Sequence, residues 1–219
     1  MATLRTEAET RDLLALVQWL SPAFPVGSYA FSHGLEQAVA AGDVRDAPAF
    51  AAWLGTIVLH GSGWCDAVLV SLAHRGSHSA AELAALSSAL AAGSERWRET
   101  AEQGAAFLKA TNALLDTAYP PMPLPVAVGV QARRLSLPTE TVVGLYLQAF
   151  TGNLATIAAR IVPLGQTAAQ RCLAGLAPEI SGLAGRAAIA GLDDLASGAF
   201  RGDLAAMVHE TLDVRLFQS

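Results

Sequence analysis

Apolar residues recur at three- and four-residue spacing along most of this chain, and this pattern limits the fold more than any other feature. Leu13, Leu16, Val17 and Leu20 follow it near the start of the chain. Such spacing lines one face of an α-helix. No stretch alternates apolar and polar residues between turn dipeptides, as strands would. The sequence therefore predicts an all-α fold in which residues 1–219 form a single-domain multi-helix bundle of roughly ten helices.

Capping and helix-breaking residues set the expected ends of these helices. Ser21-Pro22 ends the first one, Asp46 is a candidate N-cap, and Gly93 separates helices expected over 79–92 and 94–117. Four prolines between positions 120 and 125 form a stiff break, where we expect a hinge or a boundary between two helical layers. Residues 1–8 are expected to be a flexible N-terminus. Further helices are predicted near residues 35–42, 126–135 and 139–162, and around positions 167, 178 and 203.

The composition is more apolar than that of an ordinary soluble domain. Hydrophobic residues make up 53% of the chain and charged residues 15%, with a mean hydropathy of +0.38. We expect the surplus to face a partner or a second copy, as the seam of a homodimer. The formal charge is -5 and Lys109 is the only lysine, so no dense basic patch is available and nucleic acid is not an expected partner.

One segment raises the question of a membrane. Thr141 to Ala159 is uncharged and about long enough to span a bilayer, but it contains Gln148 and Thr151, which are costly in hydrocarbon. We therefore predict a helix buried in protein and no membrane contact. The N-terminus lacks the apolar run of a secretory signal, and the two cysteines have no disulfide or metal spacing. These features favour a cytoplasmic protein.

Motifs for catalysis or metal binding are absent from the sequence. Lys109 does not stand in the G-K-[ST] of a P-loop, and no G-x-S-x-G elbow occurs. His74 and His78 are four residues apart, but a glycine between them ends the helix. His60 and Cys65 flank a glycine-rich turn and would make a metal pair, although an ordinary buried cysteine is the simpler interpretation. We expect a non-enzymatic protein with no catalytic residue and no preformed metal site.

The segment from Ser21 to Glu36 reads SPAFPVGSYAFSHGLE. Its two prolines and Gly27 fix a turn that projects Tyr29, Phe31 and His33 just ahead of a helix. Aromatic residues in such a loop contact a partner, or they plug the core of their own chain. The sequence leaves both interpretations open.

Polar residues follow one face of the long helix predicted over 139–162. Tyr146, Asn153 and Arg160 are seven residues apart, close to two helical turns. Buried polar groups need partners, so this face packs against polar groups inside the fold or faces another chain. Gln166 and Gln170 share one face of the following helix, and neutral amides suit a hydrogen-bonded contact better than acid-base chemistry.

The last residues of the chain, 211–219, are unusually apolar for a free end. Val214, Leu216 and Phe217 surround Arg215 there. Such a tail is expected when a partner covers it, and docking onto its own core is the alternative. We interpret 211–219 as a partner-docking tail.

Three of these segments, residues 21–36, residues 146–170 and the tail from His209, resemble the signatures of the UreF family of urease accessory proteins. Weaker matches around Gln103 and at 125–129 extend the resemblance in pieces across nearly the whole chain. Two positions depart from it. Phe24 stands where the family is expected to have leucine, and Gln218 where it has arginine, so the tail lacks that guanidinium.

The resemblance implies a non-catalytic role in urease maturation. UreF proteins are helical dimers that join UreD, also called UreH, and recruit the GTPase UreG, and the complex passes nickel to apo-urease as GTP is hydrolysed. By that resemblance, this chain would regulate the GTPase, bind no cofactor stably, and contact nickel only transiently. Without the resemblance, a soluble helical interaction protein of another pathway, or less readily a membrane-associated helical protein, would be the interpretation. The residues expected to contact partners are Tyr29, Ser32, His33, Glu36, Asn153, Arg160, Gln166, Gln170, His209, Glu210, Arg215, Leu216 and Phe217.

Overall fold

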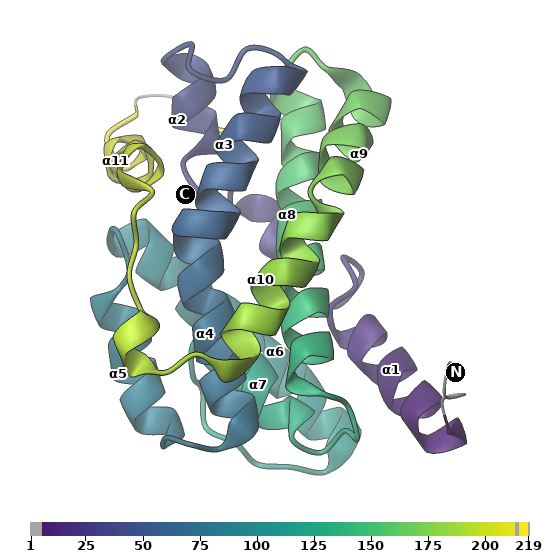
Figure 1. Ribbon diagram of the computed structural model, residues 1–219. Coiled ribbons are helices and arrows are strands. Elements are labelled where there is room, and N and C mark those ends of the chain that lie inside the picture. Colours follow the sequence, from purple (N-terminus) through teal and green to yellow (C-terminus); the bar gives the residue numbers. More distant parts are fainter. Residues whose placement is uncertain (1–5, 213–214, 219) are drawn as a thin grey trace.

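The computed structural model describes residues 6–212 and 215–218, and these residues form an all-α bundle (Figure 1). The predicted fold class is confirmed. The one bridge of β type in the described residues joins Phe31 to Gln218. The helices are α1 (Glu7–Trp19), α2 (Leu35–Ala40), α3 (Ala47–His60), α4 (Ser62–Arg75), α5 (Ala80–Ala89), α6 (Ser94–Leu115), α7 (Leu124–Ala132), α8 (Thr139–Ile161), α9 (Gly165–Gly175), α10 (Ala177–Ile189) and α11 (Phe200–His209), with 3-10 turns η1 (Ser28–Ala30) and η2 (Leu192–Asp194).

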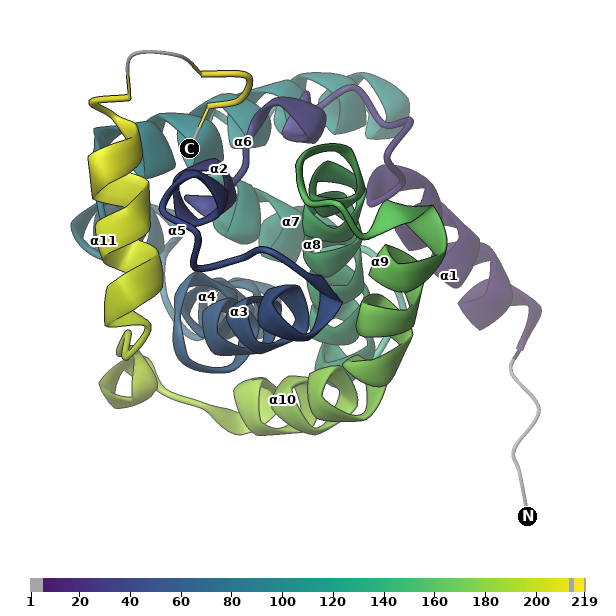
Figure 2. The ribbon, with the colours of Figure 1, turned by 90° about the horizontal axis from the view of Figure 1, so that it is seen from above.

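Helix α4 lies at the centre of the bundle. It packs against α3, α5, α7, α8 and α10 and is buried on nearly every side, as expected for a helix that is apolar all round (Figures 1 and 2). Its closest neighbour is α7, where a Cβ on Gly129 would lie 2.5 Å from the carbonyl oxygen of Val70. Glycine at this position allows the two backbones to touch, and this contact anchors the core.

Local signals explain where several helices begin and end. The Asp46 carboxylate accepts a hydrogen bond from the amide of Ala49, 2.9 Å away, so the predicted N-cap of α3 is confirmed. Ser79 and Glu82 form a capping box at the start of α5. Gly76 ends α4 in the left-handed conformation, with φ of 70°.

Two stretches are long and apolar enough to cross a membrane by length and composition, residues 47–75 and helix α8. Most of the apolar 18-residue part of the first stretch is buried inside the bundle, and half of the corresponding part of α8 is buried. Helix α8 corresponds to the long helix expected over 139–162. Much of its apolar surface is covered by neighbouring helices.

Helix α1 extends away from the rest of the bundle (Figures 1 and 2). Thr6 caps it, so the segment expected to be flexible, residues 1–8, overlaps the start of α1; residues 1–5 lie outside the described part. The Asp12 carboxylate accepts a hydrogen bond from the amide of Ser136, which ties α1 to the α7–α8 connection. Leu14 and Val17 remain exposed on α1.

The C-terminal part of the chain returns to the N-terminal part. Helix α11 packs against α2, α6 and α3, and the last described residues, 215–218, lie beside α2 and α6 (Figure 2). Gly34 permits this approach, because a Cβ there would lie 2.7 Å from the backbone nitrogen of Ala206. Residues more than one hundred positions apart therefore meet around the first turns of α6.

Candidate functional site

The first turns of α6 carry a buried ionic cluster, which we call the Arg96 cluster. Arg96 donates to Asp66 of α4 at 2.7 Å and to Glu99 at 2.9 Å. Glu99 also lies 2.9 Å from the Nε2 atom of His33 and accepts from Gln103. The hydroxyl of Tyr146 on α8 donates to Asp66 at 2.7 Å. The Arg96 cluster consists of these six residues, and it joins the loop before α2 to α4, α6 and α8.

Neighbouring charges in this cluster favour the ionised forms of Glu99 and Arg96. Burial alone would raise the pKa of Glu99, but His33 and Arg96 lower it to about 2. Burial opposes the charge on Arg96, yet Asp66 and Glu99 raise its pKa. Burial, followed by the charge of Asp66, raises the pKa of Tyr146, so its hydroxyl stays a neutral donor. The cluster is therefore a set of mutually satisfied charges, which is typical of a structural network.

Two cavities adjoin the Arg96 cluster. A cavity of about 130 Å³ lies between the end of α1, the 20–29 loop, α6 and α8, and a smaller one of about 40 Å³ lies towards α5 and α11. His33, Asp66 and Arg96 line both. The Thr100 hydroxyl, which borders the smaller cavity, is buried and has no hydrogen-bond partner among the residues that the structure describes. Both spaces have the size and polarity to hold ordered water.

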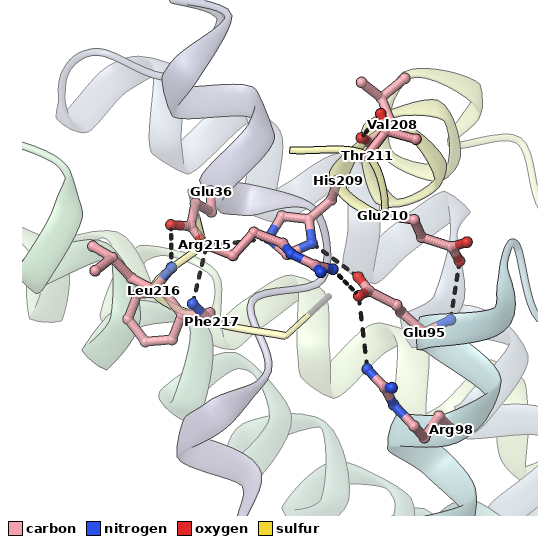
Figure 3. A network of polar contacts seen from close by, with 10 residues as sticks. All are labelled: Glu36, Glu95, Arg98, Val208, His209, Glu210, Thr211, Arg215, Leu216 and Phe217. Atoms are coloured by element: carbon pink, nitrogen blue, oxygen red, sulfur yellow. Dashed lines mark hydrogen bonds and ion pairs between the residues drawn. The ribbon is translucent and has the colours of Figure 1, made fainter. Parts of the chain in front are cut away.

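A second polar cluster closes the C-terminus onto the bundle (Figure 3). The Nδ1 atom of His209 lies 2.9 Å from Glu95 and its Nε2 atom lies 3.1 Å from Glu36. Arg215 donates to the other oxygen of Glu95 at 2.5 Å. The amides of Leu216 and Phe217 donate to Glu36 at 2.8 and 3.0 Å. We call Glu36, Glu95, His209, Arg215 and these two amides the C-terminal clasp.

Further contacts hold the tail on either side of the C-terminal clasp. The backbone amide of Gln218 donates to the carbonyl of Ala30, and its backbone carbonyl accepts from the amide of Ser32, both at 2.6 Å. These two hydrogen bonds form the bridge between Gln218 and Phe31. The Phe217 ring is buried, with the Arg160 guanidinium 5.2 Å from its centroid. The described part of the tail thus packs on its own chain. Asp213, Val214 and Ser219, which belong to the predicted docking tail, lie outside the described residues.

Helix α11 is also tied to α6 by Glu210. Its carboxylate accepts the backbone amide of Glu95 at 3.0 Å, at the start of α6 (Figure 3). This hydrogen bond lowers the pKa of Glu210. Glu210 therefore caps α6 from a position 115 residues further along the chain.

The loop before α2 has an uncommon backbone. His33 has φ of 53° and Gly34 has φ of 76°, both in the left-handed region. His33 is held there by Glu99 and by the Phe150 ring, whose centroid is 4.7 Å from the imidazole. Asn153 supports the same loop by donating to the carbonyl of Ser28. The loop and the tail therefore share a frame built from α6 and α8.

The structure distributes the expected partner-contact residues between the interior and the surface. Ser32, His33, His209 and Phe217 are buried. Glu36, Asn153 and Glu210 are half-buried. The exposed residues are Tyr29, Arg160, Gln166, Gln170, Arg215 and Leu216. Phe31 is buried in the core, as one of the two interpretations expected, whereas Tyr29 is 69% exposed and its contact with a partner stays a prediction.

Sequence reasoning did not single out four of the charged residues that organise the site: Asp66, Glu95, Arg96 and Glu99. A signal was present, since Glu95, Glu99 and Gln103 recur every fourth residue and so share one face of α6. A charged face on a helix is normally solvated. The sequence of α6 alone does not show that residues of α2, α4 and α11 cover its charged face. The pairing is a property of the tertiary fold.

Comparisons with known proteins identify the family. The UreF family model matches residues 44–177. The chain is 52% identical over 206 residues to a protein of Dinoroseobacter shibae named "Urease accessory protein UreF", covering 94% of this chain and 98% of that one. The chain belongs to the UreF family. A UreF protein of Cereibacter sphaeroides is 52% identical over 207 residues, covering 94% and 98% of the two chains, and one of Rhizobium etli is 44% identical over 220 residues, covering 97% and 99%.

Three of the residues considered as metal ligands, Cys65, His74 and His78, lie in different surroundings in this UreF protein. Burial and the nearby Asp66 charge raise the pKa of the Cys65 thiol to about 12, which disfavours the thiolate that metals bind. His74 contacts Thr139, whereas His78 contacts Ser77. Within residues 6–212 and 215–218, no group of three or more His, Cys, Asp or Glu side chains has the geometry to hold a metal ion.

Proposed function

We propose that this UreF protein is a cytoplasmic, non-catalytic assembly factor that bridges UreD (UreH) and the GTPase UreG and supports GTP-dependent nickel delivery to apo-urease. Family membership supports the link to urease maturation. The observation that carries the bridging role is a solvent-facing apolar stripe beside the C-terminal clasp. Nickel is the cargo of the complex, and its contact with this chain is transient.

The stripe runs along the outer face of α11. It consists of Phe200, Leu204, Met207 and Val208, at successive spacings of four, three and one positions. This spacing places them on one face of the helix, and all four side chains are exposed. Leu216 on the docked tail is also exposed, at 75%, as a separate apolar side chain. We define the four residues on the helix as the α11 stripe and assign this stripe, together with Leu216, to UreD. Exposed apolar clusters of this kind are characteristic of protein–protein contacts.

Replacing Leu204 by aspartate is expected to reduce UreD capture at least about tenfold, because a charge would be desolvated at the centre of the α11 stripe. A chain ending at Leu212 removes Leu216 and should also capture less UreD. Matched pull-downs with purified UreD measure both effects. Ile189→Asp is the control, since it places the same charge at an exposed aliphatic position on α10. Undiminished capture by both variants would remove the α11 stripe and the tail from the proposal.

Helix α9 offers a different, polar surface. Gln166 and Gln170 are exposed and one helical turn apart. We assign them to the UreG-binding face, together with the exposed Arg160 at the end of α8. Neutral amides and a guanidinium can form hydrogen bonds to a partner without any transfer of a proton.

Gln166→Ala is expected to lower urease activation several-fold while changing the free energy of unfolding by less than about 0.5 kcal/mol. An exposed amide contributes little to folding, so the loss should lie in partner binding. Urease activation in cells and thermal unfolding of the purified chain provide the two measurements. Gln148→Ala, at an exposed amide on α8, is the matched control. Equal losses of activation and stability would place Gln166 in a structural role instead.

The homodimer contact is assigned to the apolar face around α1. Leu14 and Val17 on α1 are exposed, and so is Leu114 on α6. A groove lined by Phe24, Ala110, Ala113 and Leu114 lies at the end of α1. Sedimentation of the purified chain measures its mass in solution, and a mass of one chain at micromolar concentration would remove the homodimer from the proposal.

Two other functions remain as competitors: an interaction protein of another pathway and a membrane-associated helical protein. A urease activation assay in cells that lack this gene separates the first, because nickel-loaded urease in its absence would overturn the proposal. Fractionation of the same cells separates the second. The protein should be recovered with the soluble accessory proteins.

A further inference from the structure

The larger of the two cavities beside the Arg96 cluster has the size of a single aromatic ring. Its volume is about 130 Å³, and a protein cavity of about 150 Å³ is large enough to hold benzene. Pro22, Tyr29 and Thr156 line this cavity and are themselves exposed. The larger cavity therefore faces solvent between the 20–29 loop and α8.

The walls of the larger cavity are apolar and largely aromatic. Trp19 and Phe107 are buried there and meet edge to face, with their ring centroids 6.3 Å apart. Phe150 adds a third ring from α8, and Leu20 and Leu124 supply aliphatic surface. Aromatic rings pack favourably on one another edge to face or offset. These walls therefore suit a flat apolar ring better than a flexible polar chain.

All six residues of the Arg96 cluster also line the larger cavity, and two of them have unused hydrogen-bond acceptors. The ionised Glu99 carboxylate can only accept, so the Gln103 amide must turn its NH2 group towards it, 2.9 Å away. The carbonyl oxygen of Gln103, a residue that is 4% exposed, accepts no hydrogen bond from any described residue. Tyr146 donates its hydroxyl proton to Asp66, which leaves lone pairs on the hydroxyl oxygen. An O–H or N–H group on a ligand would satisfy these acceptors.

The charges around the larger cavity disfavour an anion. Asp66 and Glu99 both line it, and Arg96 already donates one nitrogen to each of them. A carboxylate on a ligand would compete with these two buried carboxylates for the guanidinium and would be repelled by them. A neutral ligand avoids this repulsion, and it gives up less hydration than an ion on entering an apolar space. The preferred ligand is therefore uncharged.

We propose that the larger cavity is a binding site for a small neutral aromatic molecule that carries one O–H or N–H donor, such as a phenol or an azole. The ring of the ligand lies among Trp19, Phe107 and Phe150, and its donor reaches the acceptors of Gln103 and Tyr146. Binding displaces water from these acceptors, and the donor of the ligand replaces the hydrogen bond that water made. One chain supplies every residue of the site, so binding requires neither UreD nor UreG.

Titration of the purified full-length chain with phenol, followed by NMR, tests the site. We expect saturable binding of phenol with a Kd on the order of 1 mM. The shifts should appear at the indole N–H of Trp19 and at the side-chain amide of Gln103, which both line the larger cavity. Toluene has nearly the same shape but no donor and leaves the acceptors without a partner, so it should bind about tenfold more weakly. Benzoate, an anion, should show no binding at the same concentrations.

Two variants place the binding in the larger cavity. Ala149 lines it from α8, so Ala149→Leu fills part of the space and should lower the affinity for phenol at least about tenfold. Ala52→Leu makes the same change at an exposed position on α3 and is the matched control, which should bind phenol like the wild-type chain. Gln103→Met keeps a side chain of similar size but removes the acceptor, so it should lose most of the preference for phenol over toluene.

The wild-type ligand series decides the matter even where a variant fails to fold. The proposal is overturned if phenol shows no saturable binding, or if phenol and toluene bind the wild-type chain equally well. Benzoate binding as tightly as phenol would overturn it too, as would unchanged phenol binding by a folded Ala149→Leu chain.

Discussion

Replacing Arg96 by methionine is expected to lower the free energy of unfolding by about 3–5 kcal/mol. The guanidinium is the buried cation that faces both Asp66 and Glu99, and its side chain is 11% exposed. Methionine fills a similar volume but leaves the two carboxylates without the positive charge of the guanidinium. Removing one partner of a buried ionic network costs far more than the net stabilisation that the network provides. Chemical denaturation at neutral pH, monitored by helical circular dichroism, measures the loss.

Arg98→Met is the matched control for this prediction. Arg98 lies on the same helix, is 49% exposed, and makes a longer ion pair of 3.6 Å with Glu95. Solvent screens such a pair, so the expected loss is below about 1 kcal/mol. Similar losses for both variants would mean that the Arg96 cluster is better solvated than its burial indicates.

The Arg96 cluster also determines how the loop before α2 is presented. Glu99 binds Arg96 and His33, and His33 holds its left-handed backbone next to Gly34. That conformation costs free energy for a residue with a side chain, so its contacts must maintain it. The loop in turn receives Gln218 of the tail. A substitution that disrupts the Arg96 cluster is therefore expected to change the conformation of the surface loop that carries Tyr29.

Helices could be predicted from the sequence because their signals are local. The helix expected over 139–162 corresponds to α8 at Thr139–Ile161, and the predicted cap at Asp46 starts α3. The spacing of apolar residues and the capping residues act within a few positions of each helix. The proline-rich stretch was expected to mark a hinge or layer boundary. In the structure it connects α6 to α7, which pack directly against each other.

The candidate site could be predicted only in part, because its contacts join distant positions. The sequence singled out His209, Glu36 and Arg215 by their resemblance to family motifs, but it could not pair them. His209 meets Glu95 across 114 positions, and no spacing rule carries that information. Two interpretations of the tail also stayed open. The structure places the Phe217 ring inside its own chain and leaves Leu216 outside, so burial alternates within two residues.

The close packing of α6 on α7 leads to the second large expected effect. Gly104 lies where α6 passes the start of α7, and a Cβ there would overlap the carbonyl oxygen of Met122 and lie 2.6 Å from the amide nitrogen of Leu124. Both atoms belong to the backbone, so no side-chain rotation can make room. Gly104→Ala is therefore expected to lower the free energy of unfolding by about 2–3 kcal/mol, even though alanine is the better helix former.

The same substitution at Gly182 should have the opposite sign. Gly182 lies within α10, and a Cβ there would have no neighbour within 4 Å. Alanine at this position restricts the unfolded chain and favours the helix without a clash, so a gain of about 0.5–1 kcal/mol is expected. Denaturant midpoints of the two variants measure the difference. A gain at both positions would show that α7 can move away from α6, and the backbone contact at Gly104 would then not be what fixes the first turns of α7 beneath the site.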